Sequence, residues 1–133
     1  MKRSAYLALV FALLSSAAYA HHSRAMFDVT RNITFRGVVR AYNWQNPHTT
    51  IVVVGNNAKD SSTAGTWNIE ASSASIMRAG GWSKNTLEMG DKITVVAHPN
   101  RDGSKDVLLF YVIMPDGKRL YRAAHRYSGE VDE

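Results

Sequence analysis

Hydrophobic and polar residues alternate over much of the chain, and this pattern predicts five β-strands. In the first strand, ITFRGVVRAYNW (33–44), Ile33, Phe35 and Val39 fall on one face, and Gly37 predicts a bulge or a sharp bend. The run HTTIVVVG is more continuously apolar and rich in β-branched residues, as buried strands are. The polar run NNAKDSSTAG (56–65) is predicted to be a turn-forming connection. The remaining strands are predicted at 48–55, 66–71, 92–99 and 107–114.

A short helix is predicted within SSASIMRAGGW, between the third and fourth strands. A serine there caps the helix, Ala74 and Met77 lie three apart, and Gly80 or Gly81 ends it. A small β-rich chain must manage its exposed sheet edges, and closing into a barrel does so. The predicted fold class is therefore all-β with one short helix, arranged as a five-stranded OB-like barrel. The alternative is an open antiparallel sheet or sandwich with one covering helix.

The first twenty residues are typical of a secretory signal peptide. Lys2 and Arg3 precede an apolar run, which ends at the small-x-small pattern around Ala20. The run is too short to span a bilayer, which takes ~20 apolar residues. We therefore expect cleavage near Ala20, a periplasmic or secreted location and no integral membrane segment afterwards. The predicted organisation is a signal peptide at 1–20, an arm at 21–32, the barrel at 33–118 and a tail at 119–133.

Composition limits the function classes. The formal net charge of +5 falls to +3 without Lys2 and Arg3, so basicity gives little reason to expect a nucleic-acid partner. The chain has no cysteine, which excludes disulfides and thiol chemistry. No G-x-S-x-G, H-E-x-x-H or phosphate-binding glycine loop occurs. We therefore expect a binding protein rather than an enzyme.

The histidines predict a metal site, with copper as the expected ion. In an OB-like barrel the loops after strands one and four lie on one side, and His48 and His98 stand at these loops, each beside a proline. Cleavage would make His21 the N-terminus, whose α-amine has a pKa of ~8 in model peptides. Amine and imidazole of His21 with the imidazole of His48 would give a nitrogen plane that favours Cu(II), resembling a histidine brace. His22, His98 or Asp28 would complete or orient this site.

The same residues leave alternatives to a metal site open. Each histidine alone can serve a structural role as a strand-end, loop or arm residue. A rival site is an OB-type surface for a glycan, peptide or small anion, formed by Tyr42, Trp44 and Asn46 with the basic residues before them. A third alternative is a structural component of the cell envelope with a protein partner and no small ligand.

Several motifs together resemble a family of small exported bacterial proteins known as domain of unknown function 6152. They are HHS, MFD, NWQNPH, WNIE, RAGGW, LEMGDKITVVAHPNRDGSKD and MPDG, spread over nearly the whole mature chain. The resemblance implies a signal peptide and a small OB-like domain, and it implies no activity. It marks His21, His22 and His48 as site candidates, and Asp28 more weakly. One departure is ASSAS before the helix, where family members carry a proline-containing turn.

Overall fold

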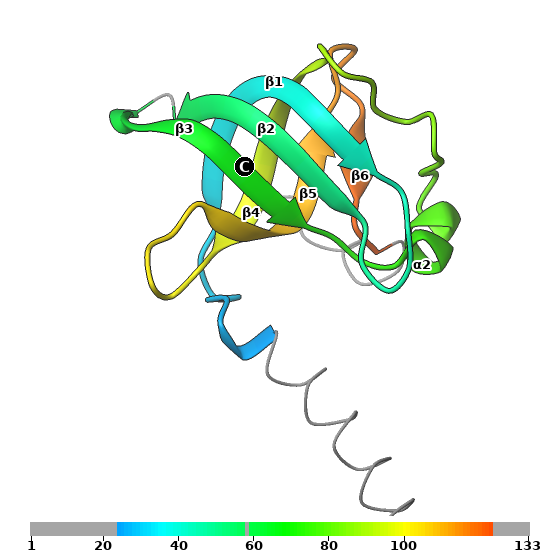
Figure 1. The fold of residues 1–133 in the computed structure, drawn as a ribbon, viewed down its shortest axis with the longest axis horizontal. Helices are drawn as coiled ribbons and strands as arrows, with labels where there is room; N and C mark the ends of the chain where they lie inside the picture. Colours follow the sequence, from blue (N-terminus) through cyan, green and yellow to red (C-terminus); the bar gives the residue numbers. More distant parts are fainter. Residues whose placement is uncertain (1–23, 58, 124–133) are drawn as a thin grey trace, which may run out of the picture.

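The computed structural model describes residues 24–57 and 59–123, which form a β-barrel with one added strand (Figure 1). The helix α2 is the one helix that begins and ends within these ranges. It lies between β3 and β4, as predicted. The elements are β1 Ile33–Asn43, β2 Thr50–Asn57, β3 Asp60–Glu70, α2 Ala74–Ala79, β4 Lys92–Pro99, β5 Asp106–Ile113 and β6 Arg119–Tyr121.

Strand β5 closes the barrel. The sheet runs in the order β3-β2-β1-β4-β5, and β5 then pairs in parallel with β3 through Asn68–Asp106, Ile69–Val107 and Glu70–Leu108. The other neighbours are antiparallel. This closure confirms the predicted five-stranded barrel, and the alternative of an open sheet or sandwich is wrong.

The core fills the barrel and is covered at one end by α2. Met77 of α2 and Trp82 just beyond it are buried in the same cluster as the inward side chains of the five strands. Ser73 caps α2, because its Oγ accepts a hydrogen bond from the Ile76 N–H at 3.3 Å. The largest fully buried side chains of the strands are Phe35, Val39, Ile51, Val53, Ile69, Val95, Val107, Leu109 and Val112.

The bulge in β1 lies at Arg40 and not at Gly37, which corrects one prediction. Gly37 pairs in regular register with Gly55. Val39 and Ala41, in contrast, pair with successive residues of β2, so Arg40 between them is the additional residue of the bulge. A Cβ on Gly37 would lie 2.5 Å from the Val54 carbonyl oxygen, so glycine serves the close approach of two strands.

The predicted connection at 56–65 is mostly strand. β2 continues to Asn57 and β3 begins at Asp60, so the two form a hairpin that projects beyond the barrel (Figure 1). Both of its faces meet solvent, so it lacks the alternating apolar residues that predict a strand. Polar side chains hold it instead, for example where the Thr63 Oγ1 accepts from the Asn57 N–H at 2.8 Å.

The predicted tail begins with β6, which pairs with β5 at Tyr111–Tyr121 and Ile113–Arg119. The Trp82 Nε1–H donates to the Tyr121 carbonyl at 2.9 Å and so ties β6 to the segment after α2. The predicted signal peptide and the rest of the tail lie outside the described residues. Among those described, no helix is long and apolar enough to cross a membrane.

Candidate functional site

The described part of the predicted arm lies against the connection between β4 and β5. Phe27 forms a β-bridge with Asn100 and is 3% exposed. The Asp28 N–H donates to the Pro99 carbonyl at 2.9 Å, and the Arg101 N–H donates to the Met26 carbonyl at 2.8 Å. These contacts fix the path along which the chain enters the barrel.

A groove of about 370 Å³ lies between this arm and the outer surface of β2, β3 and β5. We call it the arm groove. Two carboxylates, Glu70 and Asp106, line it, and the Asp106 Oδ1 accepts from the Asn68 amide at 2.9 Å. The complete lining is Met26, Phe27, Thr50, Ile51, Val52, Asn68, Ile69, Glu70, Asp106 and Val107.

His48 stands beside the arm groove, in contact with Glu70. Its Nδ1 lies 3.3 Å from the Glu70 Oε1 and 3.4 Å from the Ala71 carbonyl oxygen. Because both neighbours are acceptors, they favour the tautomer with the proton on Nδ1 and the lone pair on Nε2. The His48 side chain is 42% exposed, so the ring remains accessible from solvent.

His98 is buried and does not lie exposed at the barrel rim, where the sequence predicts it. It is 5% exposed, its Nδ1 donates to the Arg31 carbonyl at 3.0 Å, and its ring packs on Phe110. Strand β5 lies between it and Glu70, since Leu108 pairs with both. Throughout residues 24–57 and 59–123, no three His, Cys, Asp or Glu side chains gather where they could hold a metal ion.

Asp28 occupies a tight turn at the end of the arm. Its Oδ1 accepts from the Thr30 hydroxyl at 2.6 Å and from the Thr30 N–H at 3.2 Å. These hydrogen bonds lower the pKa of the Asp28 carboxyl. The predicted ligands His21 and His22 lie outside the described residues.

The aromatic surface predicted at Tyr42, Trp44 and Asn46 makes mainly structural contacts. Because of the bulge at Arg40, Tyr42 faces the barrel interior and not the outside. Its direct partner on β2 is the core residue Ile51. Tyr42 donates its hydroxyl to the Ser83 carbonyl at 2.8 Å, and burial raises its pKa. Trp44 packs beside Tyr42, and the Asn46 Oδ1 accepts from the Ser75 N–H at 3.4 Å.

The structure adds Glu70 as a functional candidate. The sequence contains one signal for it, the alternation in WNIE that puts Ile69 inside and Glu70 outside. Its contact with His48 depends on the pairing of Thr50 with Glu70, which the sequence pattern does not specify.

The family comparison agrees with the sequence motifs. The model of a family of unknown function, DUF6152, matches residues 9–109, and the chain belongs to this family. No curated protein and no solved structure matches the chain.

Proposed function

We propose that this chain is an exported periplasmic protein that binds copper through His21 and His48 and is not an enzyme. The observation that carries the proposal is the orientation of His48 by Glu70 and the Ala71 carbonyl beside the arm groove.

The ring contacts of His48 suit a metal ligand. Metal-ligating histidines typically donate their second ring N–H to a carboxylate or a backbone carbonyl, which fixes the ring and raises its basicity. Both kinds of acceptor lie within 3.4 Å of the His48 Nδ1. The lone pair on Nε2 is then available to a metal ion from the solvent side.

The proposal requires His21 to approach His48 from the anchored arm. Met26 and Glu70 line the same groove, and His48 contacts Glu70. His21 precedes Met26 by five residues, which span at most ~18 Å when extended. This short connection to the anchored Met26 is the reach that the proposed contact with His48 has available.

In this proposal, export supplies one further metal ligand, the α-amine of His21. Cleavage after Ala20 frees the α-amine of His21, and this amine with one imidazole forms a chelate. A second imidazole, from His48, completes a set of three nitrogens, which suits tetragonal Cu(II). Neither His98, which is buried, nor Asp28, which bonds to Thr30, is needed for this set.

The test is Cu(II) electron paramagnetic resonance on protein exported and processed by the cell, with its start at His21 verified by mass spectrometry. We expect a tetragonal spectrum with nitrogen couplings that change in His48→Ala. A control chain with one alanine added before His21 should lose most of its affinity, because the amine moves away from the ring. Weak binding that neither change affects would contradict the proposal.

A further inference from the structure

A second surface, where the outside of β1 and β4 adjoins β6 and the C-terminal end of β5, carries three exposed cations. The strand register places Arg36, Thr94, Ile113 and Arg119 in one row, because each is the direct partner of the next. Directly paired residues share a face of the sheet. The neighbouring pair Val38–Lys92 adds a third cation to this surface, which we call the basic face.

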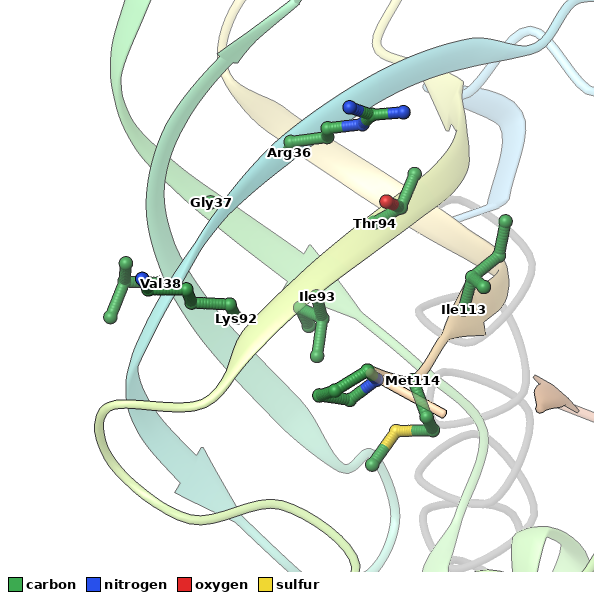
Figure 2. Close-up of a pocket in the computed structure, with 9 residues that line it drawn as sticks. Arg36, Gly37, Val38, Lys92, Ile93, Thr94, Ile113 and Met114 are labelled. Atoms are coloured by element: carbon green, nitrogen blue, oxygen red, sulfur yellow. The ribbon is translucent and has the colours of Figure 1, made fainter. Parts of the chain in front are cut away.

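Two grooves flank this row. The first, of about 450 Å³, includes Arg36, Lys92 and Thr94, and Figure 2 shows these side chains on β1 and β4 beside Ile113 and Met114 of the β5 end. The second, of about 660 Å³, shares Arg36, Thr94 and Ile113 with the first and adds Lys59. Neither groove has an Asp or Glu among its lining residues.

The cations of the basic face are available to a ligand. Arg36, Lys92 and Arg119 are exposed, and none forms an ion pair with any residue that the structure describes. Arg119 lies over the Tyr111 ring, with its guanidinium carbon 5.3 Å from the ring centroid. The neutral donors in the second groove include the Asn32 and Asn57 amides and the Thr34 hydroxyl.

The spacing of the charges indicates a ligand with repeated anionic groups. Arg36 and Arg119 are separated by three strand spacings, about 14 Å in a regular sheet. The cations are therefore spread along the row and are not gathered at one point. The grooves also offer hydroxyl and amide groups between the cations, which match a ligand that carries hydroxyls as well as charges.

Two other polyanions fit less well. Among the described residues, the exposed large apolar side chains are Met26, Val29, Val54, Ile76 and Met89, and none lines either groove. The apolar side chains that do line the first groove, Val38, Ile113 and Met114, are half-buried, so the face offers little to insert into a bilayer. Single-stranded nucleic acid is usually held by aromatic stacking. Phe35, the aromatic residue in these linings, is buried, and Tyr111 on the same face is covered by the Arg119 guanidinium.

We propose that the basic face binds a segment of an anionic polysaccharide, with its carboxylates on Arg36, Lys92 and Arg119. This inference does not depend on copper binding, since no lining residue of either groove lines the arm groove.

The test is isothermal titration calorimetry of the processed chain with a decamer of galacturonic acid at low salt, with a neutral maltodecamer as control. We expect Arg36→Gln and Lys92→Gln each to weaken binding about tenfold. The matched control Lys84→Gln removes an exposed cation from the turn after α2, outside both grooves, and should leave the affinity unchanged.

Both variants are measured, and the melting temperature of each shows whether it folds. The test therefore remains decisive if one of them fails to fold. Wild-type affinity in both variants, an equal loss in Lys84→Gln or equal binding of the maltodecamer would overturn the proposal. Binding of polyphosphate or of phosphatidylglycerol vesicles without binding of the galacturonate decamer would also overturn it.

Discussion

The imidazole of His48 and the carboxylate of Glu70 lie side by side at the barrel rim, with Nδ1 3.3 Å from Oε1. His48 belongs to the loop between β1 and β2, and Glu70 is the last residue of β3. The two elements meet because β2 pairs with β3 from Thr50–Glu70 onward. The barrel itself therefore orients the ring.

Replacing Glu70 by glutamine should lower the copper affinity of the processed chain about tenfold, because the His48 ring loses a charged acceptor that fixes its orientation. Competition titration with a chromogenic chelator measures this change. The matched control is Glu88→Gln, which alters an exposed carboxylate in the loop before β4 and should bind copper normally. Equal copper affinities in the two variants would show that Glu70 does not contribute to the copper site.

Gly55→Ala should destabilise the barrel by about 3 kcal/mol, since an overpacked site forces the backbone to shift. A Cβ there would lie 2.0 Å from the Arg36 carbonyl oxygen and 2.7 Å from the Gly37 Cα. Gly103→Ala is the comparison, because nothing lies within 4 Å and the positive φ of 78° alone should cost about 1 kcal/mol. Urea denaturation followed by circular dichroism distinguishes the two costs, and a smaller loss in Gly55→Ala would contradict the close strand approach.

Phe27→Ala should cost about 3 kcal/mol of unfolding free energy, because the ring is buried between the arm and the barrel. Met26→Ala changes the adjacent residue, which is 42% exposed, and should cost much less. Hydrogen exchange gives a second measurement, since the Asp28 and Arg101 amides should lose protection in Phe27→Ala. Unchanged protection in that variant would show that the arm is held by its backbone hydrogen bonds alone.

Tyr42 should make the protein sensitive to alkali. Burial raises the pKa of its hydroxyl above the ordinary value of about 10. The neutral form is therefore favoured in the folded state, so this contribution is complete below pH ~10 and declines as pH rises above it. Thermal melting of Tyr42→Phe should show a shallower loss of stability above that pH than the wild type. Parallel pH curves would exclude this role for Tyr42.

Much of the fold is predictable from the sequence, because it depends on local patterns. Alternation around Ile33 and Phe35, the apolar run before Gly55 and the serine cap of α2 each act within a few residues. The bulge at Arg40 is not predictable in this way, since the alternation continues through it without a break. Its consequence is the inward position of Tyr42, which the sequence pattern places outside.

The candidate site is less predictable, because its contacts join distant segments. His48 and Asp28 are recognisable by residue type, but the acceptors that orient His48 come from the end of β3. The burial of His98 depends on the arm, whose Arg31 carbonyl accepts from its ring. No local pattern carries that information.

The parallel pairing of β3 with β5 has a consequence for how the chain folds. Asn68 and Asp106, which join the two strands, are 38 residues apart in sequence. Until β5 is in place, the β1–β2–β3 meander has an unpaired edge at β3, and such an edge is a template for association with other chains. Contacts between distant residues also form slowly, because the intervening loop must close first. We therefore expect the docking of β5 to limit the folding rate, and aggregation during refolding to begin at the β3 edge.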